Sequence, residues 1–338
     1  MTDYAPNTTA GEIVKPERSL SRRWFLLGVL AVLFAFPILQ VVTGEFNYWI
    51  HMALFAFMYV SLASSWNIIG GYTGYISLGH NVFLAIGAYF AGLVYAYNGI
   101  SPFVTAPIAG LVAMAFGFVI GLITLRTSGS TFIIATIALV FLSMFLLDKW
   151  EYAGGANGLS LTLIDLPRDT AKLPFYYAML IAMILTLVMS YHIRHSKFGL
   201  GLRAIAQDET KAEVAGIPTN QYKIAAFALS ALFAGVVGAY WGYYLTYLRP
   251  TLFLTIAIAS RIVLMAIVGG KGTVAGPVLG AVILVGVNEF FVAELGSSEL
   301  NIAATGVIMV LVLLFFPSGI VGTLKERGRL PKFLDWEE

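Results

Sequence analysis

The 338-residue chain has no cysteine, and only 11% of its residues are charged. The absence of cysteine excludes disulfides, thiolate chemistry and cysteine metal sites. This absence is compatible with any cellular compartment. Soluble domains carry roughly 25% charged residues, whereas no Asp, Glu, Lys or Arg occurs here between Phe46 and Leu125. A water-soluble fold cannot bury so much continuous apolar chain, so we predict a polytopic all-α membrane protein. The apolar runs do not alternate, which excludes a transmembrane β-barrel.

Polar breaks divide the apolar chain into about ten predicted membrane spans. They cover residues 24–43, 48–69, 81–97, 103–125, 131–147, 174–193, 223–248, 251–270, 274–293 and 302–316. The segments 81–97 and 251–270 are candidates for broken or re-entrant helices. The predicted domains are an N-terminal tail (1–23), a transmembrane domain (24–317) with a polar loop (194–222), and a C-terminal tail (318–338).

The distribution of basic residues predicts the orientation in the membrane. Lys and Arg gather on the side of the N-terminus, and the opposite side holds only Lys149, Arg168, Lys172 and Arg249. Such a bias places the N-terminus and the C-terminus in the cytoplasm. The net charge of +2 is too small to suggest nucleic acid as a partner.

No group of residues has the spacing of a catalytic or metal site, so we predict that the chain is not an enzyme and holds no cofactor. The stretch around Lys271 lacks the first glycine and the Ser or Thr of a phosphate-binding loop. The spans also lack the several buried acids of an ion-coupled pump. Arg261 and Glu289 are the candidates for a role in the translocation path. They lie in neighbouring spans, and structural pairing of the two is the favoured interpretation.

Two glycine-rich stretches each precede a predicted span and fall on the same side of the membrane. They contain Gly70, Gly71, Gly74 and Gly79, and Gly269, Gly270, Gly272 and Gly276. For most of these glycines, tight helix packing is the favoured interpretation. The functional interpretation is that broken helices line a polar route near Ser77, His80 and Asn81.

Residues 194–221 form the only long polar segment of mixed charge inside the apolar chain. Leu202, Ile205 and Glu209 share one face at helical spacing, and Gly216 with Pro218 ends the pattern. We therefore predict one short amphipathic helix over residues 201–216, outside the bilayer and facing the cytoplasm. It is either a solvated connector on lipid headgroups or a handle that a soluble partner grips.

Three stretches resemble the permease subunits of ATP-binding-cassette importers for branched-chain amino acids, of the LivH/LivM type. They are residues 67–89 (NIIGGYTGYISLGHNVFLAIGAY), 199–238 and 265–280 (MAIVGGKGTVAGPVLG). Together with GGANGL at 154–159, the resemblance covers most of residues 67–317. The long outer loop and the chain length make it closer to the LivM type.

The resemblance implies a role for the polar helix. In such importers a cytoplasmic helix docks into a cleft on the ATPase subunit and transmits its closure. Here that helix carries the ATPase-coupling candidates Arg203, Asp208, Glu209, Glu213 and Gly216. The sequence Ala212-Glu213-Val214-Ala215-Gly216 departs from the importers' usual Glu-Ala-Ala followed by glycine.

The resemblance also implies the partners and the location. The partners are a second permease subunit, two cytoplasmic ATPase subunits that bind the ATP, and a periplasmic substrate-binding protein. The location is the bacterial inner membrane. The alternatives are an importer of urea or short-chain amides and, from another class, a stand-alone channel or ion-coupled carrier. Dependence on an ATPase separates the importers from the channel or carrier, and a membrane-embedded enzyme is the least favoured alternative.

Overall fold

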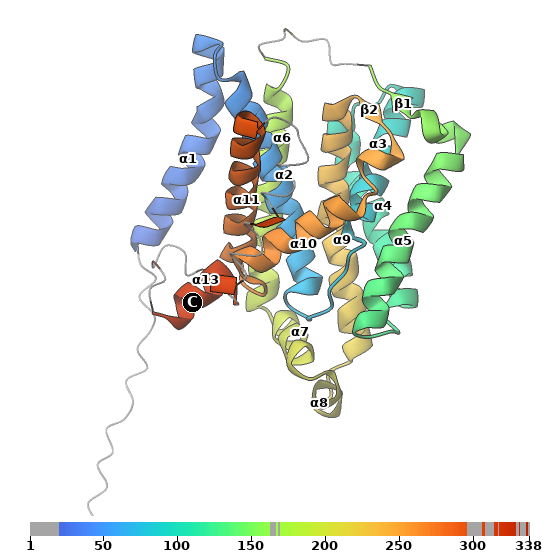
Figure 1. The fold of residues 1–338 in the computed structure, drawn as a ribbon, viewed down its shortest axis with the longest axis vertical. Helices are drawn as coiled ribbons and strands as arrows, with labels where there is room; N and C mark the ends of the chain where they lie inside the picture. The colour runs from blue at the N-terminus through green and yellow to red at the C-terminus, as the bar shows by residue number, and fades with distance from the viewer. Residues whose placement is uncertain are drawn as a thin grey trace, which may run out of the picture.

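The fold is a bundle of long helices in a computed structural model that describes residues 20–162, 167, 170–295, 306–307, 314–316, 318–328, 331 and 336. Figure 1 shows the bundle with its helices running mostly along one direction. The long helices are α1 (Leu20–Thr43), α2 (Asn47–Gly70), α3 (His80–Asn98), α4 (Pro102–Thr124), α5 (Ser130–Lys149), α6 (Leu173–His195), α9 (Thr219–Leu245), α10 (Ile256–Gly270) and α11 (Ala275–Leu295). The all-α prediction is confirmed.

Eight segments among the described residues are long and apolar enough to cross a membrane. They correspond to α2–α6, α9, α11 and the segment 250–270, which contains α10. In α1 a shorter apolar helix, Leu27–Thr43, covers most of the first predicted span. The last predicted span, 302–316, falls mostly outside the described residues. The chain is therefore a multi-pass membrane protein.

Helix α9 packs against α2, α3, α4 and α6, and small residues let α3 and α4 approach it closely. A Cβ added to Gly87 of α3 would clash with the carbonyl of Gly235, and one added to Gly238 would clash with the carbonyl of Leu84. Close backbone contact of this kind drives helix association where lipid removes the hydrophobic effect. By contrast, α5 is mostly exposed in the monomer and presents an apolar surface.

The glycine-rich stretch from the end of α10 to the start of α11 serves tight packing, as predicted. A Cβ on Gly269 would clash with the carbonyl of Gly276, and one on Gly280 would clash with the carbonyl of Met265. The helices α10 and α11 therefore cross at backbone contact. The short helix α13 (Gly319–Glu326) packs against the end of this pair.

Two non-helical stretches enter the bundle. Residues 71–79 rise from the end of α2 toward the middle of the bundle before α3 begins (Figure 1). A 3-10 turn, η3 (Pro250–Leu252), and extended residues precede α10. The buried side-chain amide of Asn81 donates to the carbonyls of Phe253 (2.9 Å) and Thr255 (3.1 Å). Irregular backbone inside a membrane protein needs such partners. Helix α10 itself is continuous from Ile256 to Gly270, so a broken or re-entrant helix at residues 251–270 stays a prediction.

The end of the bundle opposite to α7 and α8 is closed by short elements (Figure 1). Two 3-10 turns, η1 (Glu151–Ala153) and η2 (Gly155–Asn157), lead into β1 (Leu159–Ser160), which pairs antiparallel with β2 (Tyr247–Leu248). The Tyr247 hydroxyl donates to the carbonyl of Asn157 at 2.5 Å. The GGANGL motif thus forms the turns through which the connection after α5 meets the connection after α9. Arg168 in the same loop lies outside the described residues.

Candidate functional site

The polar segment forms two helices, α7 (Lys197–Gln207) and α8 (Glu209–Val214), at one end of the bundle. The prediction of one continuous helix over 201–216 is wrong, because Asp208 is extended (φ −164°, ψ 109°) between them. The Asp208 carboxylate accepts from the backbone N–H of Lys211 at 3.0 Å. Aspartate favours such a cap over a position inside a helix, which explains the break. We call α7, Asp208 and α8 the elbow.

The elbow ends at Gly216, as the sequence predicts. Gly216 has φ +88°, a left-handed conformation that suits glycine. The N–H of Ile217 donates to the carbonyl of Ala212 at 3.0 Å and closes the helix. On the inner side Leu202 and Ile205 are buried, whereas Val214 at the tip is 86% exposed. The elbow is thus anchored by α7 and presents the tip of α8 to solvent.

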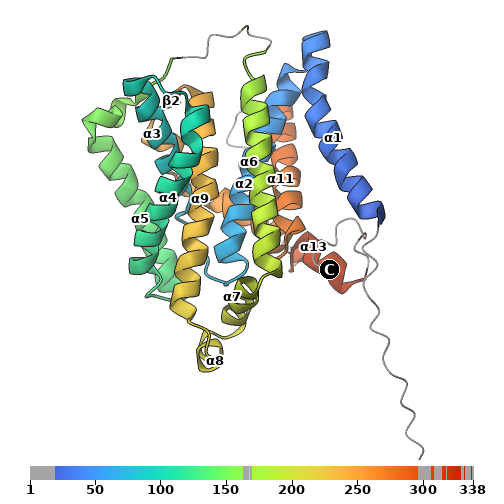
Figure 2. The ribbon, with the colours of Figure 1, turned by 180° about the vertical axis from the view of Figure 1, so that it is seen from behind.

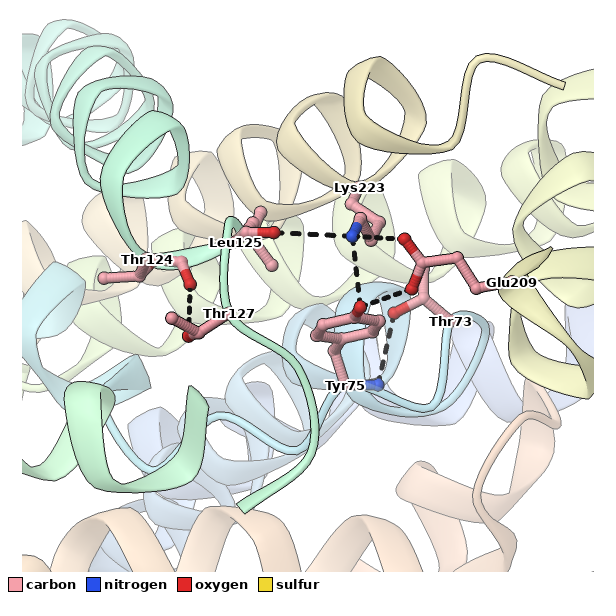
Figure 3. A network of polar contacts seen from close by, with 7 residues as sticks. All are labelled: Thr73, Tyr75, Thr124, Leu125, Thr127, Glu209 and Lys223. Carbon is pink, nitrogen blue, oxygen red and sulfur yellow. Dashed lines mark hydrogen bonds and ion pairs between the residues drawn. The ribbon is translucent and has the colours of Figure 1, made fainter. Parts of the chain in front are cut away.

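Glu209, the first residue of α8, turns inward to the bundle (Figure 3). Its Oε1 lies 2.6 Å from the ammonium of Lys223, and its Oε2 accepts a hydrogen bond from the hydroxyl of Tyr75. The Lys223 ammonium also donates to the Tyr75 hydroxyl at 3.0 Å and to the carbonyl of Leu125 at 3.4 Å. It lies 4.6 Å from the centre of the Tyr75 ring. We call Tyr75, Glu209 and Lys223 the junction.

The environment of Glu209 stabilises its charged form. Burial raises the pKa of the carboxyl, but hydrogen bonds from Lys223 and Tyr75 lower it by more, so the pKa lies below its ordinary value of 4.5. A lowered pKa gives stability that is present above the unfolded pKa and is lost as the pH falls through the folded pKa. The junction is therefore expected to stay formed at neutral and mildly acidic pH.

The other coupling candidates have different surroundings. Asp208 caps α8 and pairs with Lys211 at 3.2 Å. Arg203 of α7 is partly buried, whereas Glu213 and Gly216 are exposed. The elbow therefore contacts the bundle near Asp208, where its two helices meet, and exposes the C-terminal end of α8 to solvent.

Three translocation-path candidates, Ser77, His80 and Asn81, lie together at the start of α3 and are all buried. The Ser77 carbonyl accepts from the Trp66 indole at 2.8 Å, and His80 Nε2 lies 2.9 Å from the hydroxyl of Ser65. His80 Nδ1 and Asn81 Oδ1 have no hydrogen-bond partner within the described part of the chain. A cluster of polar groups therefore sits inside the bundle, where the chain enters it.

The predicted pairing of Arg261 with Glu289 is wrong. No ion pair joins the two in the part of the chain that the structure describes. Instead, Arg261 donates to the Tyr59 hydroxyl at 3.4 Å, and Glu289 accepts from the Tyr48 hydroxyl at 3.3 Å. Arg261 borders a cavity of about 10 Å³ between α2, α10 and α11, which is also lined by Phe55, Tyr59, Met265, Leu284, Val285 and Asn288.

Sequence reasoning missed Asn67, Tyr75 and Lys223. The Asn67 amide donates to the carbonyl of Thr273 and accepts from the N–H of Gly272, both at 2.8 Å, so it joins the two glycine-rich stretches. Arg194 donates to the carbonyl of Gly272 as well. The two stretches therefore lie on one side of the molecule, as predicted. A lysine at the start of an apolar span is the one signal in the sequence that could have identified Lys223.

Residues 48–316 match the family described as branched-chain amino acid transport system / permease component. The permease protein LivM of the high-affinity branched-chain amino acid transport system of Salmonella typhimurium is 26% identical over 339 residues, 92% of this chain and 78% of LivM. The corresponding LivH of Salmonella typhimurium is 25% identical over 78% of this chain and 91% of its own length.

A further relative is named for another solute. The fructose import permease protein FruG of Bifidobacterium longum is 24% identical over 81% of this chain and 86% of its own length. No solved structure matches the chain. The family match spans most of the chain and agrees with the resemblance of the three sequence stretches. The chain therefore belongs to the family of branched-chain amino acid transport permeases, which are transport proteins and not enzymes.

Proposed function

We propose that the chain is the permease subunit of an ATP-driven importer that carries branched-chain or other apolar amino acids across a bacterial inner membrane. Its N-terminus and C-terminus lie in the cytoplasm, in accord with the bias of Lys and Arg. ATP is bound by two partner ATPase subunits, a second permease completes the pore, and a periplasmic binding protein delivers the solute.

The observation that carries this proposal is the elbow. Figure 2 shows α8 beyond the ends of the membrane-spanning helices. A helix that rests on headgroups lies in the interface plane and buries an apolar face there. In α8 the exposed apolar side chain is Val214, at a tip that points away from the bundle, with Glu213 and Gly216 beside it. This form suits insertion into a cleft on a soluble ATPase.

The side chains around Arg261 suggest the class of solute; the cavity there has room for about one water, so a solute would enter it only in a wider conformation. The lining residues of this cavity are mostly apolar, and they include Arg261 and Asn288. An ionisable group inside a membrane span is costly and is expected to serve function. A guanidinium binds carboxylates well, and apolar walls suit an aliphatic side chain. We therefore propose that Arg261 contacts the carboxylate of the passing amino acid. Urea and short-chain amides lack this carboxylate.

Replacing Arg261 with glutamine is expected to slow amino acid uptake roughly tenfold, because a hydrogen bond to a charged group contributes about 1.5–3 kcal/mol. ATPase binding should not change, since Arg261 lies away from the elbow. Uptake of labelled leucine into proteoliposomes measures the effect. Arg261→Lys is the matched control, because it keeps the charge and should retain most of the rate. Equal uptake by Arg261→Gln and the native chain would contradict the role.

The function is tested by uptake in proteoliposomes that contain this chain with its ATPases, partner permease and binding protein. Leucine should enter only when ATP is supplied on the cytoplasmic side, and excess urea, acetamide or fructose should not compete with it. If urea or acetamide enters in place of leucine, the solute is misassigned. If the chain alone conducts without ATP, the channel or carrier alternative holds.

A further inference from the structure

We propose that the junction transmits the movement of the elbow to residues 71–79, with Tyr75 and Lys223 as its positioning residues. The proposal rests on the proposed function, because it explains how a force applied to α8 reaches the membrane interior. The contacts of the junction, the segments it joins and the chain of rings behind it each support this role.

The contacts of the junction form a closed ring of short bonds (Figure 3). Each carboxylate oxygen of Glu209 has its own partner, Lys223 for Oε1 and Tyr75 for Oε2, and Lys223 also bonds Tyr75. An ammonium has three donors, and its three contacts, with Glu209, Tyr75 and the carbonyl of Leu125, use them all. The side chain of Lys223 is only 6% exposed. Such a ring fixes the relative positions of its members.

The junction, with the contact of Lys223 to Leu125, ties α8 and the start of α9 to two segments that are distant in sequence. Tyr75 belongs to the stretch between α2 and α3, Leu125 follows α4, Glu209 begins α8, and Lys223 lies in the first turns of α9. Helix α8 is bounded by the extended Asp208 at one end and by Gly216 at the other. Backbone dihedrals at these two points can absorb a rotation of α8. A rotation that keeps the ring intact must therefore move Tyr75.

Tyr75 is in turn tied to the polar cluster at the start of α3. Its backbone N–H donates to the Thr73 hydroxyl at 3.3 Å, next to Gly74, whose backbone faces Ala206 of α7. Its ring begins a row of aromatic contacts that ends at His80. The ring centres are 5.4 Å apart for Tyr75–Phe132, 6.3 Å for Phe132–Phe227, 5.2 Å for Phe227–Phe83 and 5.7 Å for Phe83–His80. Packed side chains of this kind can carry coupling between sites.

Hydrogen exchange of the purified full chain tests the link without any partner. Tyr75→Phe removes one hydroxyl and keeps the ring, so folding should be retained. We expect it to raise amide exchange roughly tenfold in both the 71–79 and the 209–216 peptides, since typical coupling between sites is about 5–150-fold. Lys223→Met should do the same. Lys172→Met is the matched control, because Lys172 bonds a backbone carbonyl elsewhere in the chain, that of Asn47. A rise confined to the 71–79 peptide in Tyr75→Phe would overturn the proposal.

Transport by the complete complex in proteoliposomes gives the second readout. Tyr75→Phe should keep ATPase binding and ATP hydrolysis but lower the leucine moved per ATP roughly tenfold. Either single variant, Glu209→Lys or Lys223→Glu, should also lower the leucine moved per ATP. The double variant, which exchanges the two charges, should move more leucine per ATP than either single variant. An unchanged ratio, or an equal fall in hydrolysis and uptake, would overturn the proposal. If the native complex shows no ATP-dependent uptake, the proposed function fails, and the exchange experiment still decides the junction.

Discussion

Gly87→Val is expected to prevent stable assembly of the bundle, the largest loss of stability that we predict. Gly87 of α3 faces the carbonyl of Gly235 in α9 so closely that even one added carbon clashes with backbone. Backbone atoms cannot change rotamer to make room, so the two helices must separate. Overpacking of a core costs about 1–3 kcal/mol and occasionally more, and this site is expected at or above the upper end.

The effect is measured as the unfolding temperature and the monodisperse fraction of detergent-purified protein. Gly286→Val is the matched control. Gly286 also lies within a long helix, α11, but an added Cβ there meets nothing within 4 Å. Both variants introduce the same β-branched residue into a helix, so the difference between them isolates the clash. Similar unfolding temperatures for the two variants would show that α3 and α9 are not in backbone contact.

Val214→Asp is expected to abolish stable binding of the ATPase subunits while the permease itself stays folded. Val214 is 86% exposed in the free chain, so the substitution costs the fold little. In the complex its apolar side chain would enter the ATPase cleft, where an aspartate would be buried without a partner. Residues at the centre of an interface contribute about 2 kcal/mol or more when truncated, which corresponds to a Kd at least about thirtyfold weaker.

The measurement is the Kd of the purified ATPase subunit for the permease in nanodiscs. Ile100→Asp is the matched control, because Ile100 is also an exposed apolar residue but lies just after α3, at the end of that helix away from the elbow. It should bind the ATPase as the native chain does. Native affinity in Val214→Asp would remove α8 from the interface and favour the solvated-connector interpretation of the elbow.

Composition and periodicity were sufficient to predict the all-α membrane fold and the position of the elbow. Charged residues are so rare in this chain that a polar stretch between apolar runs could only lie outside the bilayer. The break at Asp208 was missed because the helical pattern of apolar residues continues across it. The spacing of apolar residues is the same whether Asp208 lies inside one helix or caps the start of a second helix. The hydrogen bond from the backbone N–H of Lys211 shows that Asp208 is a cap.

The orientation of individual carboxylates depends on tertiary contacts that no local pattern contains. Glu209 and Glu213 are four residues apart, a spacing that places both on one face of a helix. In the structure Glu209 begins α8 and bonds Lys223, whereas Glu213 is exposed. Similarly, Arg261 and Glu289 lie in neighbouring helices, but their side chains reach Tyr59 and Tyr48 instead of each other. The partners of Arg261 and Glu289 lie more than a hundred residues away in sequence, as does Tyr75, the second partner of Glu209.

The central claim is that separate ATPases drive this permease through the elbow. The most direct test is purification of the chain from its native membrane with residues 209–216 either native or scrambled, followed by mass identification of the co-purifying proteins. The account predicts that an ATPase and a second permease accompany the native elbow and that the ATPase is lost with the scrambled one. A chain that purifies alone and moves solute in liposomes without ATP would contradict it.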